Sequence, residues 1–457
     1  MQLTTKQLDT AHADKKRQAK RALTLAQALT QASAALLGVA APVTAVQAED
    51  HGWQVDTAAL FYSEADGRVQ AAEPVVNLSK DFGDERILNL KLVVDSLTGA
   101  SPNGAAPASV AQTFTGPSGN ANYTIAAGES PLDDSFKDTR VALSAGWQQP
   151  LGDALKLTVG GNVSSEYDFK SVALNAALAR DLNNKNTTLS AGLNLEFDAI
   201  DPVGGAPVGL SSMVTADKGG SDSKTVTDLL LGVTQVLSRN AIVQVNYSLS
   251  MASGYQSDPY KLLTVVDAGN NLILDPSPEN SDSQYLYLYE ARPDSRMRHS
   301  LFTDFKYAVG ENVLGLSYRF TTDDWGINTH TLDARYRFAL GHEMYLEPHV
   351  RWYTQNEADF YRAYLREGSD VAISGSTVTP LLTEASADPR LAAFDATTVG
   401  LKFGIGLGRD SEFNVRIEQY QQTGKGDSAP ASGHLAGQEL FPELSATTLM
   451  LGYSFRW

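Results

Sequence analysis

The chain has 457 residues, with 36 Lys and Arg against 53 Asp and Glu, and its formal net charge of -17 excludes nucleic acid as a default partner. Charged residues make up 19% of it, below the roughly 25% of an ordinary soluble domain. There is no cysteine, which excludes disulfides, thiolate metal sites and cysteine nucleophiles. Beyond the N-terminus no run approaches the ~18 consecutive apolar residues of a membrane-spanning helix.

The N-terminus has the layout of a secretory signal peptide. Basic residues between Lys15 and Arg21 precede a mildly apolar stretch at 22–41, and Val46-Gln47-Ala48 has the small-residue pattern of a cleavage site. We therefore expect residues 1–48 to be removed on export and residues 49–457 to form one domain. An amphipathic helix of a soluble protein is the alternative for this segment.

The rest of the chain repeats one sequence pattern, in which apolar and polar side chains alternate. In 241–251, for example, Val243 and Val245 share one face while Gln244 and Asn246 share the other. A period of two predicts strands, and small polar residues on the second face indicate contact with water. Such segments occur at 52–63, 69–80, 86–98, 137–149, 154–165, 169–181, 187–199, 224–237, 241–254, 297–309, 313–323, 328–340, 344–356, 397–408, 412–422 and 446–457.

The connections between these segments alternate in length. Every second one is a tight turn, whereas those at about 99–135, 200–222, 255–295 and 357–395 are long and 423–444 is intermediate. Short periplasmic turns, long extracellular loops and an even strand number are typical of bacterial outer-membrane barrels. In lipid every backbone N–H and C=O must be paired, so a strand protein has to close on itself.

The sequence therefore predicts an all-β fold, a transmembrane antiparallel β-barrel of about sixteen strands, with fourteen or eighteen as alternatives. A soluble β-sandwich also alternates but fits the regular tight turns less well. We expect the protein in the outer membrane, in contact with its lipid and lipopolysaccharide.

The last segment carries the sharpest short signal. Leu449, Leu451, Tyr453, Phe455 and Trp457 share its lipid face, and the chain ends on an aromatic residue. Terminal aromatic residues suit the membrane–water interface, and this pattern resembles the closing strand that the barrel-assembly machinery recognises. We predict that Tyr453, Phe455 and Trp457 form this assembly signal.

Alternation places ten charged residues on the inward faces of four consecutive strands between 297 and 356, where they would form one charged wall. These are Arg298, Asp304, Lys306, Arg319, Asp333, Arg335, Arg337, Glu347, His349 and Arg351, and Arg416 and Glu418 would extend them. Such a wall is a selectivity constriction, an interface for a plug, or a salt-bridged lining that only solvates the lumen. The mixed signs favour a paired network, whereas the arginine surplus in an acidic chain favours an anion or an acidic partner.

Patterns typical of catalysis are missing from the sequence. No His-x-His, His-Glu-x-x-His or Gly-x-Ser-x-Gly pattern occurs, and the alternation puts His299 and His330 on the lipid face. We predict no catalytic site, no metal and no cofactor. The acidic loops would suit Ca²⁺, or bridges to lipopolysaccharide through divalent cations, although such residues more commonly keep loops solvated. The loop carboxylates concerned are Asp258, Asp267, Asp275, Glu279, Asp282 and Asp294.

Two stretches resemble an uncharacterised family of proteobacterial outer-membrane barrels, a domain of unknown function. They are the run 254–261 with Glu290–Arg296, and the run 316–327 leading to His330-Thr331. The resemblance covers essentially the whole mature chain, including Phe136–Arg140. The resemblance implies an outer-membrane location. It also implies a gene neighbourhood with a small lipoprotein and a flavin-attaching enzyme, so that the barrel would sheathe a flavin-bearing plug.

The motif residues also have a physical interpretation, because they fall at the extracellular strand ends. Opposite charges there can pair and hold the loops over the mouth, which we prefer to ligand binding. This set is Arg140, Arg292, Asp294, Arg296, Asp323, Asp324 and Trp325. We expect Trp325 and Tyr318 in the outer interface belt, and Gly326 in a turn that needs a positive φ.

Sixteen strands enclose an aqueous lumen, so the leading prediction is a porin-like channel for small solutes or ions. The first alternative is the sheath for a small periplasmic lipoprotein in electron transfer across the outer membrane. The second is an outer-membrane lipid-acting enzyme, which would need a nucleophile–base pair near the lipid-facing rim.

Overall fold

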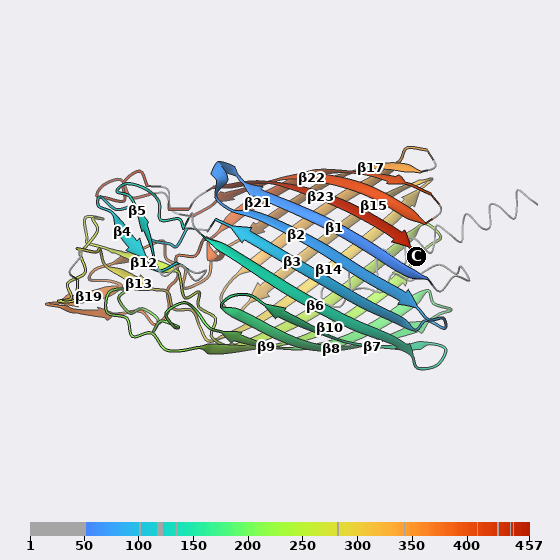
Figure 1. Ribbon diagram of the computed structural model, residues 1–457, viewed down its shortest axis with the longest axis horizontal. Coiled ribbons are helices and arrows are strands. Elements are labelled where there is room, and N and C mark those ends of the chain that lie inside the picture. The colour runs from blue at the N-terminus through green and yellow to red at the C-terminus, as the bar shows by residue number, and fades with distance from the viewer. Residues whose placement is uncertain are drawn as a thin grey trace, which may run out of the picture.

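The computed structural model describes residues 52–99, 102–116, 122–133, 136–280, 283–341, 343–408, 410–426, 429–438, 440–441 and 443–457. The predicted signal peptide at 1–48 lies outside the described residues. Within them sixteen strands form one closed antiparallel barrel (Figure 1), which confirms the predicted fold. No helix in these ranges is long and apolar enough to cross a membrane.

Each of the sixteen predicted segments corresponds to one barrel strand. These are β1 (Trp53–Glu64), β2 (Gln70–Asp81), β3 (Ile87–Thr98), β6 (Lys137–Pro150), β7 (Leu155–Ser165), β8 (Phe169–Leu182), β9 (Thr187–Ile200), β10 (Asp222–Val236), β11 (Ala241–Gly254), β14 (Ser295–Val309), β15 (Asn312–Asp323), β16 (Asn328–Ala339), β17 (Met344–Gln355), β21 (Phe394–Gly406), β22 (Ser411–Gly424) and β23 (Leu444–Arg456).

The first and last strands close the barrel. β1 pairs with β23 along its length, from Gln54 opposite Arg456 to Glu64 opposite Ala446. Beyond them the Trp53 N–H donates to the Trp457 carbonyl at 2.6 Å, and the Trp457 N–H donates back at 2.8 Å. No strand of this sheet therefore has a free edge, which is the condition for placing backbone polar groups in lipid.

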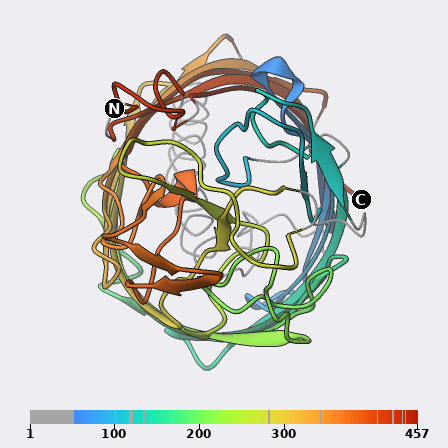
Figure 2. The same ribbon diagram turned by 90° about the vertical axis from the view of Figure 1, so that its left-hand side faces the viewer.

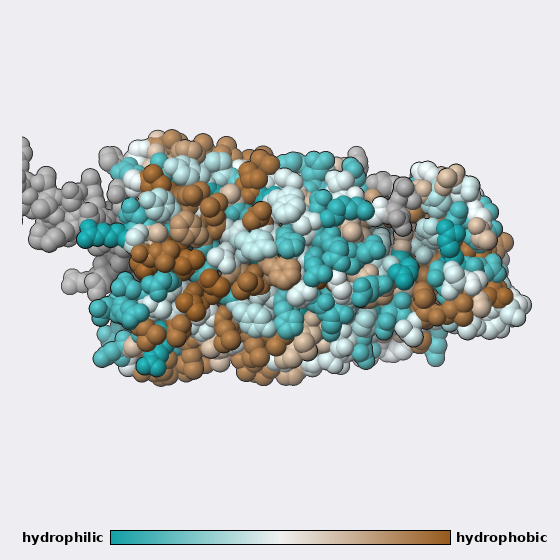
Figure 3. All heavy atoms as spheres, turned by 180° about the vertical axis from the view of Figure 1, so that it is seen from behind, coloured by the Kyte–Doolittle hydropathy of each residue, from teal (hydrophilic) through white to brown (hydrophobic). Residues whose placement is uncertain are grey.

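The outer face is apolar and the inner face is polar, because side chains alternate along every strand. On β8, Val172, Leu174 and Leu178 are exposed, while Ser171 and Asn175 at the alternate positions are buried and half-buried. Figure 3 shows apolar side chains gathered over the barrel strands, mostly toward the end away from the loops. Exposed apolar surface this extensive indicates contact with acyl chains.

The two ends of the barrel differ. Short turns such as 151–154, 183–186 and 310–311 join the strands at one end, here called the turn end. The long connections all emerge at the other end, the loop end, which also carries the short connections 166–168 and 324–327.

The long connections pack together into a cap on the loop end (Figures 1 and 2). The cap contains the sheet β13–β12–β18 and the hairpins β4–β5 and β19–β20. These strands are β4 (Gln112–Phe114), β5 (Tyr123–Ile125), β12 (Leu262–Val266), β13 (Tyr287–Tyr289), β18 (Leu365–Arg366), β19 (Val371–Ser374) and β20 (Thr377–Pro380).

The cap has its own hydrophobic core. Leu263, Val265 and Leu288 of one connection and Leu365 and Val371 of another are all 0–1% exposed. Most of the largest fully buried side chains of the described chain lie in the cap, because the barrel has an apolar outside and a polar inside. Burial of these side chains is the force that holds the loops together.

Adjacent residues on β15 test the assignment of the two faces. Leu316 is exposed on the outer face, whereas Ser317 lines the lumen. We expect Leu316→Arg to lower the free energy of unfolding by about 2–4 kcal/mol, because it places a charge in acyl chains, and Ser317→Arg to have a much smaller effect. Urea unfolding in lipid vesicles measures both variants. Equal losses would contradict the assignment.

Candidate functional site

A cavity of about 1500 Å³ lies inside the barrel along β14–β17, β21 and β22. It begins at the turn end, where Gly310, Gly341 and Gly408 line it, and reaches Tyr353 and Phe394 near the loop end. Eight of the ten charged-wall residues line this cavity, namely Asp304, Lys306, Arg319, Asp333, Arg335, Arg337, Glu347 and Arg351.

The other two wall residues lie beside the cavity. His349 is only 3% exposed within the wall, and Arg298 stands in register with Asp323 at the loop end of β15. The wall strands β14, β15, β16 and β17 are consecutive neighbours in the barrel, so the wall is continuous.

Asp333 is the centre of the wall's ionic network. Its carboxylate lies 3.1 Å from Nε of Arg335, 2.8 Å from Nε2 of His349 and 2.9 Å from Nε of Arg351. Arg335 shares the strand of Asp333, whereas the other two cations reach it from the neighbouring β17. One carboxylate therefore holds three cations from two strands.

His349 extends this network to β22. Its Nδ1 lies 2.8 Å from Oε1 of Glu418, which also pairs with Arg416 at 3.2 Å. Both ring nitrogens thus face carboxylate oxygens, and only an imidazolium donates from both. Arg416 continues to Glu347 at 3.5 Å. The expected paired network is present over the middle of the wall.

Three cations of the same wall contact aromatic rings instead of carboxylates. The Arg319 guanidinium lies 5.1 Å from the Phe302 ring centroid. Arg337 and Lys402 lie 3.5 Å and 5.4 Å from the ring of Tyr345. Within the described ranges none of these three has a carboxylate partner. The wall is therefore only partly neutralised.

The opposite side of the lumen is acidic and amide-rich. Strands β1–β3 and β6–β10 turn inward the carboxylates of Asp56, Glu73, Asp95, Glu196, Asp198 and Asp228 and the amides of Asn77, Asn89, Asn162, Asn175 and Asn194. Two cations on this side pair with carboxylates, Lys224 with Asp198 at 3.0 Å and Lys156 with Asp181 at 3.2 Å. The lumen thus has a transverse charge asymmetry.

The loop-base residues form ion pairs at the loop end. Arg140 pairs with Asp95 and lies 4.0 Å from Glu166. Arg296 donates from Nε to Asp323 at 2.8 Å. Arg292 lies 2.7 Å from Glu290 and 2.8 Å from Asp388.

The remaining loop-base acids behave differently from each other. Asp324 accepts a hydrogen bond from the Met297 N–H at 2.9 Å, and Asp294 is exposed. Of these contacts, Arg292–Asp388 joins two long connections, whereas Arg140–Asp95 and Arg296–Asp323 join neighbouring barrel strands at the base of the loops. Loop pinning by these residues stays a prediction.

The expectation that Trp325 sits in the outer interface belt is wrong. Trp325 is 3% exposed and packs edge-on to Phe360, with Ile327 and Leu391 in the same cluster. Its Nε1–H donates to the Ser295 carbonyl at 2.8 Å. The connection at 356–393 covers this turn, which the local sequence does not reveal. Gly326 does have a positive φ, at 83°.

The run 254–261 ties several connections together. Tyr260 donates its hydroxyl proton to Asp168 at 2.8 Å and accepts the Val203 N–H at 2.8 Å. The Glu290 carboxylate accepts from the Asp258 N–H and from the Ser386 hydroxyl. These family-motif residues therefore hold the cap together.

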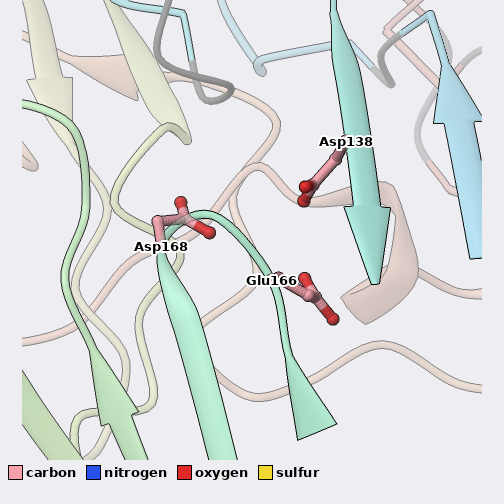
Figure 4. A group of neighbouring side chains, drawn as sticks. All are labelled: Asp138, Glu166 and Asp168. Carbon is pink, nitrogen blue, oxygen red and sulfur yellow. The ribbon is translucent and has the colours of Figure 1, made fainter. Parts of the chain in front are cut away.

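One carboxylate cluster was not found by sequence analysis. Asp138 on β6 meets Glu166 and Asp168 of the connection 166–168 (Figure 4), with carboxylate oxygens within 4.8 Å of one another. Burial and mutual repulsion raise the pKa of both Glu166 and Asp168. Arg140 and Tyr260 already contact this group. It involves none of the loop carboxylates predicted as cation ligands.

A closed antiparallel barrel with an apolar exterior and a charged lumen defines a porin-like transmembrane β-barrel protein. The chain belongs to the family described as protein of unknown function DUF3570, whose model matches residues 26–455. This confirms the resemblance seen in the sequence. A search of curated proteins finds no match.

Solved structures to which the fold is similar include one described as an outer-membrane protein and one described as a channel. OpdK from Pseudomonas aeruginosa is 9% identical with a TM-score of 0.38, over 90% of this chain and 100% of that one. OccK2 (OpdF) from the same organism, in complex with glucuronate, is 9% identical with a TM-score of 0.40, over 89% and 98%. The CymD monoaromatic hydrocarbon channel is 8% identical with a TM-score of 0.37, over 91% and 90%. Likeness at this level carries no argument about the solute.

Removal of the central carboxylate tests the ionic network. We expect Asp333→Asn to lower the free energy of unfolding by about 1–3 kcal/mol, because three cations lose their shared anion. Water in the lumen keeps this cost below that of a dry ion pair. Asp304→Asn is the matched control, since Asp304 has one ion pair, with Lys306 at 3.8 Å. An equal loss in both variants would argue against a special role for Asp333.

Acid is expected to loosen the cap. Burial disfavours the charge on Asp388, but hydrogen bonds from Arg390 and the nearby cations hold its pKa below the usual value. A carboxyl group whose pKa is lower in the folded protein than in the unfolded chain stabilises the fold at pH values above the unfolded pKa of about 3.9. This stability is lost as the pH falls through the pKa of the folded state. Burial instead raises the pKa of Glu290, so this group opposes the trend.

Limited proteolysis between pH 7 and pH 3 measures this loosening. We expect cleavage within the cap to increase below about pH 4 while the barrel stays intact. Asp388→Asn should show the increase already at pH 7. Cleavage that does not change with pH would contradict the assignment.

Proposed function

We propose that the protein is a channel of the bacterial outer membrane that passes small solutes with a preference for anions. The observation that carries this proposal is the row of cations Arg319, Arg337 and Lys402 along one side of a lumen cavity, none of which pairs with a carboxylate of the described residues. Cations without partners attract anions and repel other cations, and their effect is strong in a narrow lumen.

The outer-membrane location rests on the fold and on the sequence. The barrel has the apolar exterior of an outer-membrane protein, and the N-terminus has the layout of an export signal. Tyr453 and Trp457 are exposed on the last strand, where assembly factors and lipid would contact them. In this orientation the turn end is periplasmic, and the cap faces outward, toward lipopolysaccharide.

The cap makes the proposed channel a gated one. It lies over the loop end, whereas the cavity reaches the turns of the other end. In this proposal the cap controls passage across the barrel, by its own movement or through gaps between its connections. The ion pairs that pin the loops would set how often this happens.

A sheath for a small flavin-bearing lipoprotein is the second candidate. The cavity reaches the turn end, which is where a periplasmic partner would enter. Its volume of about 1500 Å³ is closer to the ~300–1,000 Å³ of a small-molecule pocket than to the space that a folded lipoprotein would fill. We therefore favour the channel.

Conductance of the folded barrel in a planar bilayer tests the channel. We expect ohmic steps and a reversal potential in a KCl gradient that shows anion preference. Replacing the three unpaired cations together, by Arg319→Gln, Arg337→Gln and Lys402→Gln, should lower that preference. Lys156→Gln on the opposite wall is the control and should change it little.

The outcomes separate the candidates. A correctly folded but silent barrel would overturn the channel, and a small protein that copurifies with it would then support the sheath. Conduction with cation preference would overturn the role of the charged wall while keeping the channel.

A further inference from the structure

The loop-end part of the cavity holds a group of three arginines. Arg298, Arg319 and Arg351, here called the upper arginine group, project from β14, β15 and β17. Arg319 and Arg351 line the cavity, and Arg319 is close enough to the other two for their positive charges to act on it. Within the described residues only Arg351 of this group has a carboxylate partner, Asp333.

Clustered like charges repel, and an anion between them removes this cost. The group is also built to recognise a planar anion, because guanidinium pairs with carboxylate through two parallel hydrogen bonds. Lys306 and Lys402 lie further along the wall, toward the turn end, so the cations of this group are all arginines.

Aromatic side chains surround the same group. Phe302 stands opposite Arg319 in the register, and Arg319 is followed across the sheet by Thr331 and Tyr353. The Tyr353 and Phe394 ring centroids are 5.4 Å apart. Phe302, Tyr353, Phe394 and Tyr420 all line the cavity.

These rings distinguish the site from an ordinary water-filled wall. A lumen that passes only hydrated ions gains nothing from half-buried cavity-lining rings such as Phe302 and Tyr353, since apolar surface in water is unfavourable. A flat apolar ligand would cover them, and aromatic rings pair favourably in stacked or edge-on arrangements. The site therefore offers arginines for a carboxylate and rings for the rest of the molecule.

We infer that the upper arginine group and its aromatic surroundings bind small aromatic carboxylates. This inference rests on the proposed channel, for which it names the solute class, but binding itself does not require conduction. The carboxylate pairs with Arg319 and its neighbours, and the ring lies against Phe302 and Tyr353. A tetrahedral phosphate would use the arginines and leave these rings wet.

Isothermal titration of the folded barrel in detergent tests the inference with three probes. Benzoate carries both recognised features, cyclohexanecarboxylate lacks the aromatic ring, and acetate has only the charge. We expect saturable binding of benzoate, weaker binding of cyclohexanecarboxylate, and at least about tenfold weaker binding of acetate.

Two variants separate the two halves of the site. Arg319→Gln should weaken benzoate binding at least about tenfold, because it removes a charged hydrogen-bond donor. Phe302→Leu should weaken benzoate several-fold and leave acetate unchanged. Lys156→Gln, on the opposite wall, should leave all three affinities as they are. Heat-modifiable gel mobility checks that each variant folds.

Each result has a defined meaning. Equal affinity for acetate and benzoate overturns the aromatic part of the inference, and benzoate binding that survives Arg319→Gln overturns the site. No binding by a barrel that conducts defeats this inference and leaves the channel standing. Binding by a barrel that does not conduct supports the site and overturns the channel.

Discussion

The pairing of backbone groups in lipid is the constraint on which the rest of this structure depends. A strand in a bilayer has no water for its N–H and C=O groups, so every strand needs two neighbours and the sheet must close. Here closure falls on the contact between β1 and β23, where Trp53 and Trp457 exchange hydrogen bonds. The closed sheet then turns one face to lipid and the other to the lumen.

This division explains where the two kinds of stabilising interaction lie. The lumen face carries polar and charged groups, so its order comes from ion pairs such as those around Asp333. An ordinary hydrophobic core is possible only where chain segments meet outside the bilayer, and the long connections build one in the cap. Buried ion pairs, as between Arg292 and Asp388, fix the connections relative to each other.

In the proposed channel, the charged wall and the cap have different parts in anion passage. The mixed charges in the middle of the wall neutralise each other, whereas Arg319 on one side of Asp333 and Arg337 on the other have no carboxylate partner in the described part of the chain. Anions would thus meet attractive positions at two levels of the same wall. The cap, which lies beyond the loop-end level, would decide which solutes reach it from outside.

The alternation of side chains in the sequence determined the sixteen strands and their inward and outward faces. It also determined the eight charged-wall residues that line the cavity. Both follow because the face of a strand on which a side chain lies is set by a local period of two. Local patterns failed where distant segments meet. Trp325 has the sequence context of an exposed turn, yet the connection at 356–393 buries it. Asp138 joins Glu166 and Asp168, and the packed cap forms, only through tertiary folding. Contacts between long connections depend on which side chains pack in space, and no local period encodes them.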